Sequence, residues 1–128
     1  MDESRRPGAR ASRGRLSRSA EFDRVYRQGR SHGNRYLILH QFAADREGGP
    51  RLGVSVSRKV GGAVERNRVK RVLREAFWEL AEDWPGADFV VVARADAKGL
   101  VESEGLPGVQ RELAELLDQA GRARGATA

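Results

Sequence analysis

Hydrophobic positions along this 128-residue chain recur with two different periods, one typical of strands and the other of helices. In the stretch RLGVSVSRK, Leu52, Val54 and Val56 alternate with small, polar or basic residues. Because successive side chains of a strand point to opposite faces, this pattern predicts a strand with one face in the core. The other face is small enough to let a second molecule approach the backbone, and it carries Arg51, Gly53, Ser55, Ser57 and Lys59.

Two further segments are predicted to be strands. The stretch NRYLILHQFAA, residues 34–44, is rich in strand-forming residues, and the turn DREGGP separates it from the alternating strand. The stretch ADFVVVARA, residues 87–95, is apolar through its middle, which is typical of a strand buried on both faces.

Three helices are predicted from apolar residues spaced three and four positions apart. The first has Ser19 as its N-cap, ends at Gly29, and has an apolar face of Phe22, Val25 and Tyr26. The second includes residues 66–82. The third follows a loop from Asp96 to Pro107, ends at Gly121, and has an apolar face of Val109, Leu113, Leu116, Leu117 and Ala120.

The order helix, strand, strand, helix, strand, helix indicates an α/β (α+β) fold. We expect a two-layer sandwich in which helices pack on a small mixed central sheet of about four strands. A chain of this length can bury one modest core, so we predict a single domain over residues 16–121. Residues 1–15 lack periodicity and are predicted to be a disordered basic tail, and residues 122–128 a flexible one.

Charge is distributed unevenly along the chain, whose net charge is +6. Residues 51–75 hold eight basic residues against Glu65 and Glu75, whereas residues 76–128 hold five basic residues against ten acidic ones. A concentrated basic patch is the usual electrostatic footprint of a polyanion partner, most often nucleic acid. The alternative is a solvated surface, which is the commoner meaning of a charge run.

Composition excludes several other classes. No apolar run approaches the roughly 18 residues of a membrane helix, so no membrane partner is expected. The basic N-terminus is not followed by the apolar stretch of a secretory signal, which makes the cytoplasm the expected compartment. Cysteine is absent, which excludes disulfides and thiolate metal sites.

The central helix places its apolar and basic residues on different faces. At about 100° per residue, one face collects Val69, Val72, Leu73, Ala76, Phe77 and Leu80. A neighbouring face collects Arg66, Asn67, Lys70, Arg71 and Arg74, whereas Arg68 falls on the opposite polar flank with Glu75, Glu79 and Glu82. Clustered cations repel one another by a few tenths of a kcal/mol per close pair. Such clustering is what phosphate binding requires, because each neutralised phosphate releases counterions.

The stretch GVSVSRKVGGAVERNRVKRVLREAFW, residues 53–78, resembles the signature of the protein subunit of bacterial ribonuclease P. In that family a strand leads through a Lys-Val-Gly turn into a helix that opens Arg-Asn-Arg-x-Lys-Arg-x-x-Arg. The upstream stretch SAEFDRVYRQGRSHGNRYLIL is also similar, with Phe22, Tyr26, Gly29 and Arg35 at family positions. The resemblance extends over about residues 15–120.

The resemblance implies a compact α/β fold with a left-handed βαβ crossover, which base rates alone would argue against. It also implies a protein that does not cut RNA itself. Such a protein binds a large catalytic RNA and the single-stranded 5′ leader of precursor tRNA, while Mg²⁺ held mainly by RNA performs the hydrolysis. No obligate protein partner is implied.

The resemblance also suggests site residues. The residues predicted to face the catalytic RNA are Arg58, Lys59, Arg66, Asn67, Arg68, Lys70, Arg71 and Arg74. The residues predicted to line the leader cleft are Phe22, Tyr26, Arg35, Gly53, Ser55 and Ser57. Aromatic rings suit the cleft because every base offers a face for stacking, although core packing is an equally good reading of Phe22 and Tyr26. No catalytic residue and no protein metal ligand is predicted.

This chain departs from the family pattern in the turn and in the first predicted strand. Gly62 stands where the family often has Asn, so one polar contact to RNA is expected to be missing. His40 and Leu37 stand where aromatic residues are common, which predicts a leader cleft with less stacking.

Other functions remain open on the sequence. A self-sufficient ribonuclease would use His32 and His40 as acid and base, with Lys59 stabilising charge. A general RNA-binding or ribosomal protein would have the same electrostatics without a role in processing. A membrane-surface role fits less well, because the apolar face of the basic helix is needed for the core.

Overall fold

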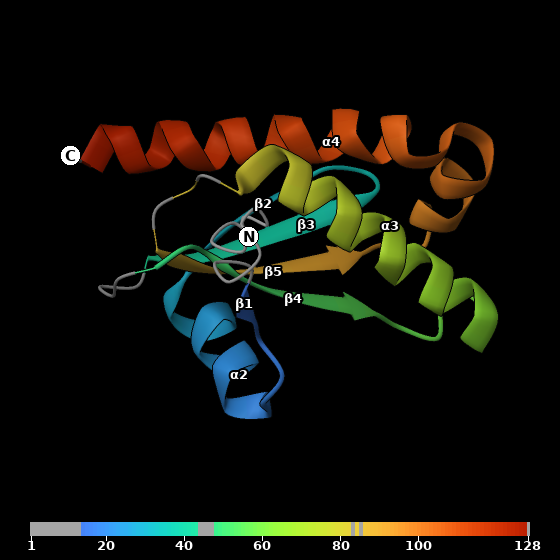
Figure 1. Cartoon of the computed structure of the whole chain (residues 1–128), viewed down its shortest axis with the longest axis horizontal. Coiled ribbons are helices and arrows are strands. Elements are labelled where there is room, and N and C mark those ends of the chain that lie inside the picture. The colour runs from blue at the N-terminus through green and yellow to red at the C-terminus, as the bar shows by residue number, and fades with distance from the viewer. Residues whose placement is uncertain (1–13, 44–47, 83, 85, 128) are drawn as a thin grey trace, which may run out of the picture.

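A computed structural model describes residues 14–43, 48–82, 84 and 86–127, with side chains described as far as Gly121. The elements are β1 (Gly14–Arg15), α2 (Ser19–Gln28), β2 (Arg30–Gly33), β3 (Leu37–Ala43), β4 (Arg51–Val56), α3 (Ala63–Ala81), β5 (Ala87–Ala93) and α4 (Ala97–Thr127). Figure 1 shows the helices lying above and below one sheet.

The sheet is mixed and has five strands in the order β1-β4-β5-β3-β2. β4 is parallel to both β1 and β5, whereas β3 is antiparallel to β5 and to β2. The parallel neighbours β4 and β5 are joined through α3, which is the βαβ unit expected from the family resemblance. The prediction of about four strands omitted short edge strands, because β1 and β2 are only two and four residues long.

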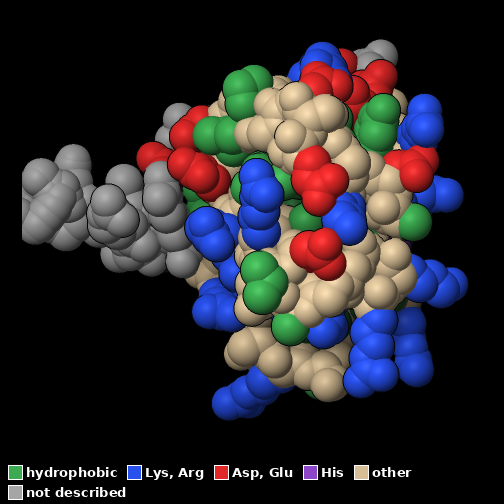
Figure 2. All heavy atoms as spheres, turned by 90° about the vertical axis from the view of Figure 1, so that its right-hand side faces the viewer, with side chains coloured by type: hydrophobic (Ala, Val, Ile, Leu, Met, Phe, Trp, Pro, Cys, Tyr) green, Lys and Arg blue, Asp and Glu red, His purple; other side chains and the backbone are tan. Residues whose placement is uncertain are grey.

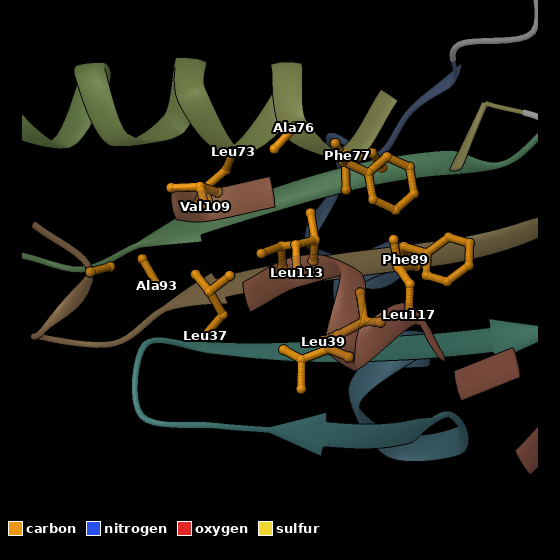
Figure 3. Close-up of a cluster of buried hydrophobic side chains, with 14 of the residues drawn as sticks. Leu37, Leu39, Leu73, Ala76, Phe77, Phe89, Ala93, Val109, Leu113 and Leu117 are labelled. Atoms are coloured by element: carbon orange, nitrogen blue, oxygen red, sulfur yellow. The ribbon is translucent and has the colours of Figure 1, made fainter. Parts of the chain in front are cut away.

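Helices cover both faces of the sheet. α3 and α4 pack on one face, where the main core includes Leu39, Leu73, Phe77, Phe89 and Leu113, all fully buried (Figure 3). α2 packs on the other face through a smaller cluster of Leu16, Val25 and Val90. The predicted two layers therefore correspond to the sheet with α3 and α4, and α2 is added below it (Figure 1).

Strand β5 contributes to both clusters. Phe89 and Val91 belong to the main core, whereas Val90 between them belongs to the cluster under α2. This two-sided burial explains the continuous apolar run in the sequence, since neither face of the strand meets solvent.

The helix boundaries differ from the prediction at several places. α2 begins at Ser19 with Arg18 as its N-cap, and the Glu21 carboxylate accepts hydrogen bonds from the backbone N–H groups of Ser17 and Arg18. Leu80, predicted to be core, is 40% exposed, whereas Ala81 is buried. The buried face of α3 is therefore turned toward the basic side of the helix.

The predicted loop from Asp96 to Pro107 is largely helical. α4 starts at Ala97, and its first segment buries Ala97, Leu100 and Val101. At Gly105, φ is 63° and ψ is −152°, which interrupts the helix, and Pro107 lies in the first turn of the segment that follows. The prediction of an end at Gly121 is also wrong, because the helix continues to Thr127. Of the predicted tails, Gly14 and Arg15 are in β1, and residues 1–13 lie outside the described residues.

A buried ion pair attaches α2 to the sheet. The Asp88 carboxylate is fully buried and accepts hydrogen bonds from Arg51 Nε at 3.0 Å and Nη2 at 2.9 Å. Arg51 Nη1 donates to Glu21 Oε2 of α2 at 3.0 Å, and Arg24 Nη2 of α2 lies 3.6 Å from Asp88. These contacts tie α2 to β4 and β5, and so position the surface that α2 presents.

Candidate nucleic-acid interface

One flank of α3 forms a row of cations that we call the cationic ridge, made of Arg66, Lys70, Arg71 and Arg74. Arg71 is exposed and the other three are half-buried. Within the described part of the chain, no ion pair or hydrogen bond joins these four side chains to a carboxylate. The ridge is therefore free to bind an external anion.

Several basic residues elsewhere are paired with carboxylates. Arg35 lies 2.7 Å from Asp96, Arg51 lies 3.0 Å from Glu21, and two further pairs join Lys98 to Glu65 and Arg111 to Glu104. The ridge differs from these pairs because its four cations have no carboxylate partner among the described residues, a state that it shares with exposed cations such as Arg58 and Lys59.

A hollow of about 210 Å³ lies between the ridge and the sheet edge. The basic residues that line it are Arg15 of β1 and Lys70 and Arg74 of α3. Burial, and secondarily the charge of Arg15, lower the pKa of the Arg74 guanidinium from its ordinary value. Both causes disfavour the charged form of Arg74, and an anion bound in the hollow would counteract them by favouring that form. Sequence reasoning missed Arg15, because it assigned this residue to a disordered tail.

The turn between β4 and α3 places more cations at the start of the ridge. Arg58 and Lys59 are exposed there, and the Ser57 Oγ accepts a hydrogen bond from the backbone N–H of Lys59 at 3.3 Å. At the first turn of α3, the Glu65 carboxylate accepts the Gly62 N–H at 2.7 Å. Ser57 thus supports the turn, and the exposed cations beside it extend the positive surface.

The remaining predicted residues of α3, Asn67 and Arg68, are both exposed. Asn67 belongs to the same helix face as the ridge, whereas Arg68 belongs to the flank of Glu75 and Glu79. Figure 2 looks at the end of the molecule where α3 begins. Most acidic side chains lie in the upper part of this view, on the side of α4, and the charged side chains of its lowest part are basic.

A second surface, which we call the aromatic patch, consists of Phe22, Tyr26 and His40 over Gly53 and Ser55. The ring centroids of Phe22 and Tyr26 are 6.3 Å apart, and Tyr26 meets His40 edge-to-face at 4.8 Å. Tyr26 is 40% exposed. The structure therefore brings together four predicted cleft residues and adds His40, whose position the sequence marked only as a departure from the family.

The aromatic patch is uncharged near neutral pH. Burial raises the pKa of the Tyr26 hydroxyl, although its hydrogen bond with Ser55 acts in the opposite direction. Burial also lowers the pKa of His40, which favours the neutral imidazole. A neutral patch of rings suits the stacking of bases better than the binding of phosphates.

Gly53 allows Phe22 to lie directly on β4. A Cβ atom at this position would be 2.6 Å from Cζ of Phe22 and 3.2 Å from Cβ of Leu16. Only glycine permits this close approach, so the strand position predicted to admit a second molecule is instead filled in part by Phe22.

Two predicted cleft residues lie away from the patch. Arg35 is in the connection between β2 and β3, where it pairs with Asp96 and lies over the Tyr36 ring at 5.6 Å. Ser57 is in the turn that leads to α3. RNA binding by these two residues stays a prediction, and the structure does not place them beside the rings of the aromatic patch.

The two histidines do not form an acid–base pair. His32 is paired with Leu39 and therefore shares its face, toward α4, whereas His40 lies on the face of Tyr26. The sheet thus separates them, which contradicts the hypothesis of a self-sufficient nuclease built on these residues.

Among the described residues, no three His, Asp or Glu side chains gather as a metal site. None of the helices described is long and apolar enough to cross a membrane.

Comparisons with known proteins point to one family. The pattern of the Ribonuclease P family matches residues 11–121. A ribonuclease P protein component of Macrococcus caseolyticus is 39% identical over 90 residues, which are 70% of this chain and 78% of the relative. One from Bacillus cereus is 34% identical over 111 residues, which are 86% and 93% of the two chains.

Solved structures agree. A Staphylococcus aureus RNase P protein, a mutant with defective mRNA degradation activity, matches with a TM-score of 0.76 and 31% identity, over 94% of this chain and 98% of that one. The RNase P protein of Thermotoga maritima matches with a TM-score of 0.69 and 29% identity, over 80% and 94% of the two chains.

Proposed function

The chain belongs to the ribonuclease P protein family, and on that premise we propose how its two surfaces are used. Membership makes it the protein component of an endoribonuclease complex whose partner is the ribonuclease P RNA. We propose that the cationic ridge binds this RNA and that the aromatic patch binds the 5′ leader of precursor tRNA.

The observation that carries the proposal is the unpaired state of the ridge. Four cations on one flank of α3 have no carboxylate partner among the described residues, although 18 acidic residues are present in the chain. Cations arranged in this way bind sugar–phosphate backbone, and the released counterions drive association. The exposed amide of Asn67 adds donors and an acceptor that can contact sugars or bases.

The aromatic patch supplies a different kind of contact. Its rings are neutral and partly exposed, so a single-stranded leader can stack on them without requiring a particular sequence. The Arg51–Asp88 pair holds α2, and with it Phe22 and Tyr26, in place. The protein then holds the leader, while the catalytic site lies on the RNA partner.

We assign the Mg²⁺ of the reaction mainly to RNA. Phosphodiester hydrolysis at the leader junction requires activated water and stabilised charge on phosphate, which Mg²⁺ supplies. The protein residues bind and orient RNA.

Reconstitution tests the proposed function. Cleavage of precursor tRNA by the catalytic RNA at low Mg²⁺ is expected to increase when the protein is added, and the product is expected to be mature tRNA with a 5′ phosphate. Protein alone should leave the substrate intact. Cleavage without the RNA would support the nuclease alternative. Equal affinity of the reconstituted complex for precursor and mature tRNA would support a general RNA-binding protein.

Tyr26→Ala tests the aromatic patch. A stacked base contributes roughly 1–3 kcal/mol, so the affinity of the reconstituted complex for precursor tRNA should fall about fivefold or more. Tyr26→Phe retains the ring and loses only the hydroxyl that bonds with Ser55, so it should have a smaller effect. The control substrate is a tRNA whose leader is too short to reach the patch. An equal loss of affinity for that substrate would contradict the assignment.

A further inference from the structure

Trp78 continues the face of α3 that carries the ridge. Asn67, Arg71, Arg74 and Trp78 are spaced at i, i+4, i+7 and i+11, so they form one row along the helix. Long side chains on a helix point back toward its N-terminus. The indole of Trp78 is therefore directed over the turn that carries the two arginines, rather than away from it.

A shallow hollow of about 400 Å³ lies at this point of the helix, and the residues around it are Arg71, Arg74, Glu75, Trp78 and Glu79. A volume of this size is in the range of small-ligand sites, roughly 300–1,000 Å³. Trp78 is half-buried and packs edge-to-face on Phe77, with ring centroids 5.1 Å apart and planes at 86°. The contact with the core holds the indole in place while part of it remains accessible.

We propose that Trp78 is a stacking platform for one unpaired nucleotide of the bound RNA, whose flanking phosphates lie on Arg71 and Arg74. This inference rests on the proposed function and adds a stacking contact to a helix face otherwise described by phosphate contacts and by the hydrogen bonds of Asn67. A ring beside two unpaired guanidinium groups is the combination that single-stranded nucleic acid recognises. A base within a duplex cannot use it, because its faces are covered by its neighbours.

The carboxylates of the hollow orient the nucleotide. Glu75 and Glu79 lie on the flank of α3 away from the ridge, and Glu79 accepts a hydrogen bond from the Gln110 amide of α4. Like charges repel, so phosphates are directed to the side of the arginines. A carboxylate can instead accept a hydrogen bond from the amino edge of a base. The nucleotide therefore lies with its phosphates toward Arg71 and Arg74 and its base toward Glu75.

Substitution at Trp78 separates stacking from packing. Trp78→Leu keeps an apolar side chain against the core but removes the large ring, whereas Trp78→Tyr keeps an aromatic ring. Affinity for the catalytic RNA should fall about fivefold or more in the leucine variant and less in the tyrosine variant. The salt dependence of binding should be unchanged in both, because stacking displaces no counterions. Equal affinities in Trp78→Leu and the wild-type protein would overturn the proposal.

Fluorescence tests the wild-type indole directly. In a Trp84→Phe background, Trp78 is the only tryptophan, since the chain has two. Titration with the catalytic RNA should quench its emission because a base stacks on it, whereas precursor tRNA alone should not. A perfect RNA duplex is the negative control.

The two proposals fail in different ways. Binding of the catalytic RNA without quenching would overturn the role of Trp78 and leave the proposed function intact. Absence of binding to the catalytic RNA in the wild-type protein would overturn the proposed function, and the role of Trp78 with it.

Discussion

Asp88→Ala is expected to lower the free energy of unfolding by about 3–5 kcal/mol, because removal of one partner leaves the other charge of a buried pair uncompensated. Asp88 is fully buried, and the side chain of Arg51, which donates two hydrogen bonds to it, is 27% exposed. Glu21 remains beside Arg51 in the variant, so the expected loss is at the lower end of that range. α2 should loosen as well, because Arg24 of α2 loses its partner in the sheet and Arg51, which contacts Glu21 of α2, is no longer held by Asp88.

Urea denaturation of the wild-type protein and the variant measures this loss. Asp96→Ala is the matched control, because it removes the carboxylate of the exposed Arg35–Asp96 pair and should leave the free energy of unfolding almost unchanged. If the two variants had equal stability, the buried pair would not be the link that holds α2 on the sheet.

A triple variant of the ridge, Lys70→Ala, Arg71→Ala and Arg74→Ala, is expected to lose roughly a hundredfold in affinity for the catalytic RNA at about 0.15 M salt. Each lost phosphate contact lowers the slope of log affinity against log salt by ~0.7–0.9. At that salt concentration, this corresponds to a loss of about a factor of five in affinity. Three contacts together therefore account for the hundredfold. At low Mg²⁺, the stimulation of precursor tRNA cleavage by the protein should disappear at concentrations that saturate the wild-type complex.

The control for the triple variant removes the same charge elsewhere. Arg94→Ala, Lys98→Ala and Arg111→Ala together delete three cations in or beside α4, two of which are paired with Glu65 and Glu104. This variant should bind the catalytic RNA nearly as well as the wild-type protein. Equal losses in the two triple variants would mean that net charge, and not the position of the ridge, determines binding.

The ridge could be predicted from the sequence because it depends on one helix. The spacing of apolar and basic residues in α3 was sufficient to place Lys70 and Arg74 on one face and Arg68 on another. The pattern could not show how α3 is rotated about its own axis relative to the sheet. Ala81 rather than Leu80 is buried at its end, and the half-buried Lys70 and Arg74 line a hollow at the sheet edge.

Features that depend on contacts between residues far apart in the chain could not be predicted from the sequence. β1 has two residues and no periodicity, and its parallel pairing with β4 is what brings Arg15 beside Arg74. The contact between Arg51 and Asp88 requires the register of β4 on β5, which places these two residues directly opposite each other. In α4, Gly99, Gly105 and Pro107 favour a loop, but the first helical segment forms because Leu100 and Val101 reach the core.

The salt dependence of affinity for the catalytic RNA, compared among Arg71→Ala, Arg74→Ala and Arg68→Ala, tests most directly whether the ridge binds phosphate. We predict that the slope of log affinity against log salt falls by somewhat less than ~1 for Arg71→Ala and for Arg74→Ala. Arg68→Ala should change it less, because Arg68 shares its flank with glutamates. Unchanged slopes at 71 and 74, or equal decreases at 68 and 71, would contradict this prediction.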